Sequence, residues 1–153
     1  MSSVLIVFLV LHIIFGTGGI VLMTAYLLLI SKKNIEIKWL KVSSILAFLA
    51  FLASWIFGGF YYTSYYGKAV KPVILKGHFA WVHEILMETK EHVFLFIPFL
   101  SLVIVAVTLA ASGDLISDSK VKKALASLAF VVVGIALFIL ILGIFVSGAV
   151  GKT

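Results

Sequence analysis

Of the 153 residues, 63% are hydrophobic and only 12% are charged, whereas soluble domains carry about a quarter charged residues, so a membrane protein is expected. The net charge of +6 comes from twelve lysines scattered between apolar stretches, which excludes the clustered basic surface of a nucleic-acid-binding protein. The absence of cysteine excludes disulfides, iron–sulfur clusters, thiolate-held zinc and covalently attached haem.

The first apolar stretch covers residues 4–30 and predicts a membrane-spanning helix, because about 20 apolar residues suffice to cross a bilayer. His12 lies inside this stretch, and Gly16, Gly18 and Gly19 follow it. Glycine in a membrane helix permits the close approach of a neighbouring helix or of a flat ligand. Helix packing is the role we expect for these glycines, with room for a flat ligand as the alternative.

A second helix is predicted over residues 42–61, after a lysine-rich loop over 31–41. Tryptophan and tyrosine are frequent between positions 55 and 66, around the end of this helix. Such residues usually form a belt at the membrane–water interface, so we expect that role here. Stacking on a cofactor is the alternative.

Residues 62–91 are predicted to form a long connection, because glycines and Pro72 interrupt them. Apolar residues return at helical spacing near residue 79, which predicts a third helix over 79–111 whose polar first turns overlap the connection. A fourth helix is predicted over 124–149, where no side chain is ionisable. The expected fold is all-α: one domain over residues 1–153, an integral membrane four-helix bundle that runs up-down-up-down, with a long outer loop between helices 2 and 3.

The lysines predict how this bundle is oriented in the membrane. Residues 31–41 hold four lysines and residues 112–123 hold three, and cytoplasmic loops are the lysine-rich ones. We therefore expect a multi-pass protein of the cell membrane. Both termini and the 62–91 connection should lie on the extracellular or periplasmic side.

Three carboxylates form a stripe at the start of the third helix. Glu84, Glu88 and Glu91 are spaced i, i+4 and i+7, and His92 follows Glu88 by four residues. Ionised carboxylates at this spacing repel one another unless a proton, a cation or a metal lies against them. Carboxylates and imidazole together suit iron, copper, zinc or manganese. These four residues are therefore candidate metal ligands, although the Glu-x-x-His and His-Glu-x-x-His motifs are absent.

Histidine inside a membrane helix is costly, and His12 is therefore a candidate functional residue. Two histidines on facing helices can hold a b-type haem as axial ligands. His92, at the mouth of the third apolar span, is the preferred partner of His12, and His83 is the other candidate. The polar start of the third helix is also where the His12 ring is expected to point, because it offers the most polar partners.

Two functions of different classes follow from these residues. The first is a small membrane redox or metal protein that binds haem b or a transition metal in the outer half of the bundle and transfers electrons to a redox partner. The second is a structural or assembly subunit of a larger membrane complex, without a cofactor. Whether the protein is an enzyme stays open. A proton path is less favoured because nothing ionisable reaches the inner half of the bundle.

Overall fold

The computed structural model describes residues 2–150, and over this range the chain is helical without strands. Four helical stretches are long and apolar enough to cross a membrane: Ser3–Ser31, Ile37–Lys76, Val82–Ala110 and Ser119–Gly148. The prediction of an all-helical, multi-pass membrane protein is confirmed at this level.

The helices run in chain order as follows. They are α1 (Ser3–Ser31), α2 (Ile37–Tyr61), the π-helix η1 (Tyr62–Val70), α3 (Lys71–Lys76), the π-helix η2 (Val82–Met87), α4 (Glu88–Phe94), α5 (Phe96–Ala110), α6 (Asp114–Ser117) and α7 (Ser119–Val150).

The segment predicted as a long loop over 62–91 is helical for most of its length, which corrects that prediction. α2 continues through η1 and α3, and the chain reverses at a short turn that begins at Gly77. Pro72 does not break this helix because it lies in the first turn of α3, where its missing N–H group is not needed. Gly67 is accommodated inside η1, whose wider i→i+5 bonding absorbs local irregularity.

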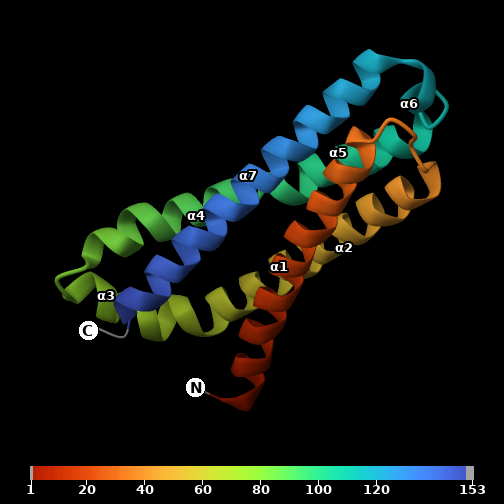
Figure 1. Ribbon diagram of the computed structural model, residues 1–153. Helices are drawn as coiled ribbons and strands as arrows, with labels where there is room; N and C mark the ends of the chain where they lie inside the picture. The colour runs from red at the N-terminus through yellow and green to blue at the C-terminus, as the bar shows by residue number, and fades with distance from the viewer. Residues whose placement is uncertain (1, 151–153) are drawn as a thin grey trace.

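This helical hairpin is longer than a membrane is thick. Ile37–Lys76 contains 40 residues, which corresponds to about 60 Å at about 1.5 Å per residue, twice the ~30 Å hydrocarbon core. Figure 1 shows the hairpin reaching past the other helices at the end marked by α3. Part of this helix must therefore extend beyond the hydrocarbon layer.

The main core lies at the opposite end of the bundle, near α6. Its fully buried residues include Met23, Tyr26 and Ile30 of α1, together with Leu40 of α2 and Val132 of α7. A buried hydrogen bond of 2.8 Å between the Tyr26 hydroxyl and Thr108 Oγ1 joins α1 to α5 within this core.

The glycines after His12 serve helix packing. A Cβ atom at Gly19 would lie 2.6 Å from the Phe51 ring, and one at Gly16 would lie 3.1 Å from Ser54 Oγ. Both glycines therefore let α1 lie close to α2. Gly18 faces open space, with no atom within 4 Å of a Cβ built there.

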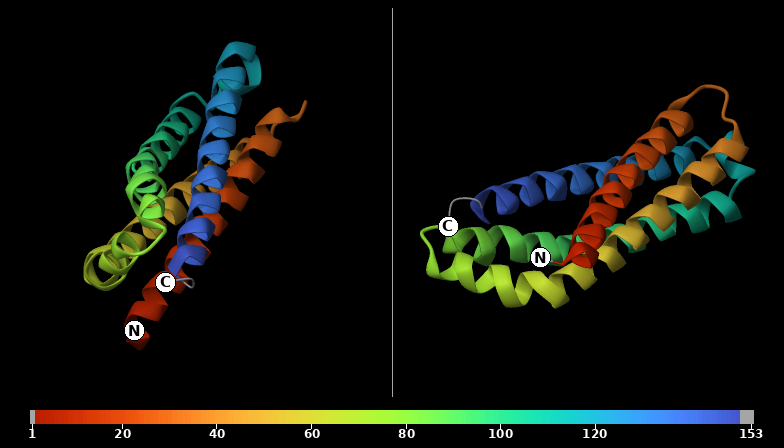
Figure 2. Two further views of the ribbon diagram at one scale, coloured as in Figure 1. Left: turned by 90° about the vertical axis from the view of Figure 1, so that its left-hand side faces the viewer. Right: turned by 90° about the horizontal axis from the view of Figure 1, so that it is seen from below.

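The first half of α1 packs on α2, and only the second half is buried in the core. The buried residues of α1 begin at Gly19, and the half before it has none. Figures 1 and 2 show the first half of α1 separating from the last part of α7. This divergence leaves the space in which the candidate site lies.

Candidate functional site

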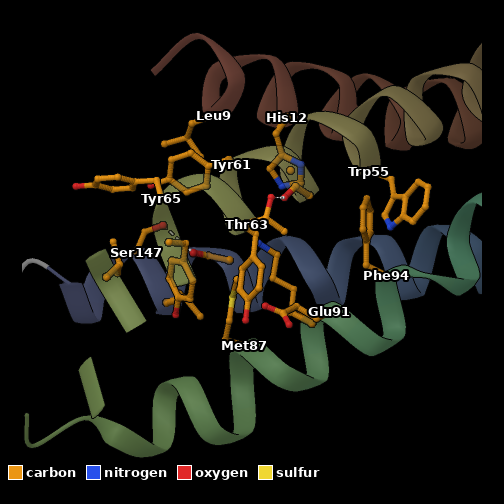
Figure 3. A pocket seen from close by; sticks show the side chains of 18 of the residues that line it. Leu9, His12, Trp55, Tyr61, Thr63, Tyr65, Met87, Glu91, Phe94 and Ser147 are labelled. Carbon is orange, nitrogen blue, oxygen red and sulfur yellow. Dashed lines mark hydrogen bonds between the residues drawn. The ribbon is translucent and has the colours of Figure 1, made fainter. Parts of the chain in front are cut away.

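A cavity of about 640 Å³ lies between the first half of α1 and the last part of α7 (Figure 3). Leu9 and His12 line it from α1, and Gly143, Val146 and Ser147 line it from α7. The remaining walls come from the end of α2, from η1, and from η2, α4 and Leu95. The cavity is mainly aromatic and aliphatic, and α1 and α4 contribute its histidine, lysine and glutamate side chains.

His12 lies on the cavity wall with one ring nitrogen bonded to α2. Its Nδ1 atom is 2.8 Å from the Ser54 carbonyl oxygen and 3.0 Å from Ser54 Oγ. Because the carbonyl can only accept, Nδ1 carries a proton and Nε2 of the neutral ring carries a lone pair. Nε2 is neither hydrogen-bonded nor buried, so we infer that it faces the cavity.

This partner differs from the expected one. His12 was expected to point to the third helix for its hydrogen bond, and it bonds to Ser54 of α2 instead. The physical reason is the close packing of α1 on α2. A Cβ atom at Gly58 would lie 2.5 Å from His12 Nδ1, so the ring rests directly on the α2 backbone. The third helix still contributes a neighbour, since the Phe94 ring lies 6.0 Å from the His12 ring, edge to face.

His92 lines the same cavity from α4. It is exposed, and its Nδ1 atom lies 2.7 Å from the Glu88 carbonyl oxygen one turn earlier. The same reasoning as for His12 assigns the proton to Nδ1 and leaves Nε2 with a lone pair. The two histidines that the sequence pairs as haem ligands thus line one cavity, and neither Nε2 atom has a hydrogen bond to a described residue.

His83 does not line the cavity. It is 1% exposed, and its Nδ1 atom lies 3.2 Å from the hydroxyl of Tyr66, which does line the cavity. His83 is therefore separated from the cavity by the Tyr66 ring. Its Nε2 atom is buried without a hydrogen-bond partner.

The acidic stripe is divided by the fold. Glu91 lines the cavity, and its Oε1 atom is buried without a partner, whereas Glu84 and Glu88 are exposed and do not line it. Figure 3 shows Glu91 and His12 on opposite walls. Within residues 2–150 no three His, Asp or Glu side chains come together as a metal-binding group.

Tyrosines form much of the wall between these polar groups. Tyr61, Tyr62, Tyr65 and Tyr66 all line the cavity. Tyr62 and Tyr66 are stacked with ring centroids 5.3 Å apart, one turn from each other in η1. The tyrosines for which the sequence predicts an interface belt thus line the cavity, with the Tyr62 and Tyr66 rings inclined by 23° and the Tyr61 and Tyr65 rings by 49°.

Lys90 is a cavity residue that is not among the site residues predicted from the sequence. It lines the cavity from α4, and its Nζ atom lies 3.4 Å from a Cβ built at Gly143 of α7. The glycine allows the lysine to extend across to α7. A lysine two residues before a candidate ligand was the only sequence signal for this role.

This arrangement can hold a flat, mostly apolar ligand that offers metal coordination to imidazole. The cavity volume is within the range of about 300–1,000 Å³ typical of ligand sites. Hydrogen bonds from the far ring nitrogen to a backbone carbonyl are typical of histidines that bind a metal.

Comparison of the chain with models of protein families, with curated proteins and with solved structures finds no match.

Proposed function

We propose that the protein is a small membrane cytochrome-like protein that binds a b-type haem between His12 and His92 and transfers electrons. The observation that carries the proposal is that these histidines, from α1 and α4, line one cavity with Nδ1 engaged by a backbone carbonyl. Each Nε2 lone pair is then available to iron. The tyrosine wall and the apolar lining suit the faces and edges of a porphyrin.

Haem is better supported than a metal held by carboxylates. The metal alternative needs three or more protein ligands, and the described side chains bring together no such group. Haem needs only two axial ligands from the protein, because the porphyrin supplies the rest. If His12 and His92 both bound the iron, no position would be open to a substrate, which would favour electron transfer over chemistry at the iron.

We further propose that the cavity lies toward the outer face of the cell membrane. His12 is roughly 14 Å from the first residue of α1 at about 1.5 Å per residue, on the side of the bundle that carries the α3 hairpin. The lysine-rich segments 31–41 and 112–123 lie at the other end and are proposed to be cytoplasmic. Both termini would then be outside, and an electron donor or acceptor would approach from that side.

The test is the absorption spectrum of protein expressed with a haem supply and purified in detergent. The expected result is a Soret band with one haem per chain, lost in His12→Ala and His92→Ala. His78→Ala is the matched control, because His78 is exposed near the hairpin turn and does not line the cavity. His92→Gly adds a rescue: free imidazole should restore the band by occupying the space of the missing ring.

Helicity and the size-exclusion profile distinguish loss of a ligand from loss of the fold. A wild-type protein with neither a Soret band nor stoichiometric metal would overturn the proposal. The structural or assembly subunit would then be the function to test, by purifying the protein from its native membrane together with its partners.

A further inference from the structure

Lys90 brings a positive charge to the cavity wall without forming an ion pair to any described side chain. Lys90 is half-buried on the cavity wall, and its Nζ atom forms neither a hydrogen bond nor an ion pair with any residue in the range 2–150. An ammonium group in mainly apolar surroundings is costly unless an anion or polar group lies against it. Lys90 is therefore expected to meet an anion that the cavity takes up.

The neighbouring carboxylate does not serve as this anion. Glu91 follows Lys90 directly, and consecutive residues on a helix point in directions about 100° apart. Lys90 extends toward Gly143 of α7, whereas the Oε1 atom of Glu91 is buried without a partner. The two groups line one cavity, and the negative charge of Glu91 acts on Lys90, but the two side chains form no direct ion pair.

The fold makes space for the lysine at this position. Nζ and Cε of Lys90 lie 3.4 Å and 3.8 Å from a Cβ built at Gly143, so a larger residue at position 143 would displace the lysine. Ser147, one turn later on α7, also lines the cavity, but its hydroxyl donates to the Gly143 carbonyl oxygen at 2.9 Å. An anionic group placed between α4 and α7 would therefore meet Lys90 as its charged partner.

We propose that Lys90 binds a carboxylate of the cavity ligand and so selects an acidic porphyrin over a neutral one. This inference rests on the proposed haem site and adds the ligand class that the site prefers. It assigns Lys90 to positioning and affinity, because the lysine contacts the edge of the ligand and not the iron. An anionic lipid headgroup could offer the same charge, and the experiment distinguishes the two.

The experiment compares haem with haem dimethyl ester, which has the same iron and ring but no carboxylates. Both are titrated into the apoprotein in one detergent, and the Kd of each is measured from the Soret band. The quantity compared is the Kd ratio of variant to wild type for each ligand, so partition of the ester into micelles cancels.

Lys90→Met is expected to weaken haem binding about tenfold, which corresponds to about 1.4 kcal/mol, and to leave binding of the ester unchanged. Lys90→Arg should keep the haem affinity within about twofold, because the charge is retained. Lys68→Met is the matched control: Lys68 is exposed in η1, does not line the cavity, and should change neither Kd.

The outcomes separate this inference from the proposed function. If both ligands bind through His12 and His92 but Lys90→Met changes neither Kd, or changes both equally, the carboxylate contact is wrong and the haem site stands. A lipid headgroup paired with Lys90 would give this pattern. If neither ligand binds the wild type, the haem site itself is overturned, and the inference with it.

Discussion

His12 and Ser54 join α1 to α2 through hydrogen bonds that run in both directions. The Ser54 hydroxyl donates to the His12 carbonyl oxygen at 2.9 Å, and the His12 Nδ1–H group donates to the Ser54 carbonyl oxygen at 2.8 Å. Gly16 permits this approach, since a Cβ built there would lie 3.1 Å from Ser54 Oγ. The same contact therefore packs two helices and fixes the His12 ring on the cavity wall.

The hydroxyl and the carbonyl of Ser54 can be tested separately. Ser54→Ala removes the interhelical donor but keeps the carbonyl that binds His12 Nδ1. We expect the free energy of unfolding to fall by about 1 kcal/mol, the typical value of one buried hydrogen bond between helices. Haem affinity should change little. The free energy of unfolding is measured by SDS unfolding in mixed micelles, followed by circular dichroism. Haem affinity is measured by Soret titration.

Ser101→Ala is the matched control for this prediction. Ser101 is as buried as Ser54, but its hydroxyl donates to the Ile97 carbonyl oxygen of its own helix at 2.7 Å. Its removal should cost less, because no contact between helices is lost. Equal losses in the two variants would show that the His12–Ser54 contact contributes nothing beyond an ordinary buried serine.

The second prediction concerns Gly58, on which the His12 ring rests. A methyl group at this position would lie 2.5 Å from His12 Nδ1, and neither the helix backbone nor the ring can move away freely. Gly58→Ala should therefore lower the free energy of unfolding by about 1–3 kcal/mol through overpacking and should displace His12 from the cavity wall. SDS unfolding and haem titration measure the two effects.

Gly59→Ala is the neighbouring control. No atom lies within 4 Å of a Cβ built at Gly59, and alanine is the better helix former by up to about 1 kcal/mol. The free energy of unfolding of Gly59→Ala should therefore stay the same as that of the wild type or rise. If both alanine variants behave alike, the close approach of His12 to Gly58 is wrong.

The sequence predicted the all-helical class of the fold, but not the hydrogen-bond partners of the candidate site residues. Long apolar stretches reveal membrane helices, since hydropathy is additive along the chain. The hydrogen bond of His12 was assigned to the wrong helix because its acceptor is the backbone carbonyl of Ser54. Every residue has a carbonyl, so no residue type marks the one that the packing makes available.

The helical hairpin was missed for a related reason. Gly67 and Pro72 were interpreted as breaks, but Pro72 falls on a helix start and Gly67 inside a π-helix. Which interpretation applies depends on helix register, which the composition of a short segment does not determine. The position of Lys90 depends on register in the same way, and the approach of Gly143 from α7 shows how the lysine extends across the cavity.

The third prediction is the orientation in the membrane. The chain has no cysteine, so a single introduced cysteine reports unambiguously on its own position. In intact cells a membrane-impermeant maleimide should label Ser64→Cys in η1, which is exposed, and should not label Ser119→Cys at the start of α7. Both should react after the membrane is permeabilised. The reverse pattern in intact cells would place the cavity on the cytoplasmic side.

The fourth prediction concerns Tyr66 and His83, which meet behind the cavity wall. Their side chains are 4% and 1% exposed, and the tyrosine hydroxyl lies 3.2 Å from His83 Nδ1. Because His83 Nε2 is already buried without a partner, this is the only hydrogen bond of the His83 ring within residues 2–150. Tyr66→Phe would leave both ring nitrogens unpaired. We expect the free energy of unfolding to fall by about 1–3 kcal/mol.

A double variant separates the lost bond from the lost hydroxyl. In Tyr66→Phe/His83→Leu both polar partners are replaced by apolar groups, which can be nearly neutral because no buried polar atom is left unpaired. The double variant should therefore be no less stable than Tyr66→Phe alone. The double-mutant cycle, measured by SDS unfolding, gives the coupling free energy between Tyr66 and His83. Tyr65→Phe is the control, since Tyr65 is only half-buried and its hydroxyl has no hydrogen bond to the described residues. If the losses in the free energy of unfolding are additive in the cycle, water or lipid, and not Tyr66, provides the hydrogen bond of His83. The contact behind the cavity wall would then not contribute to stability.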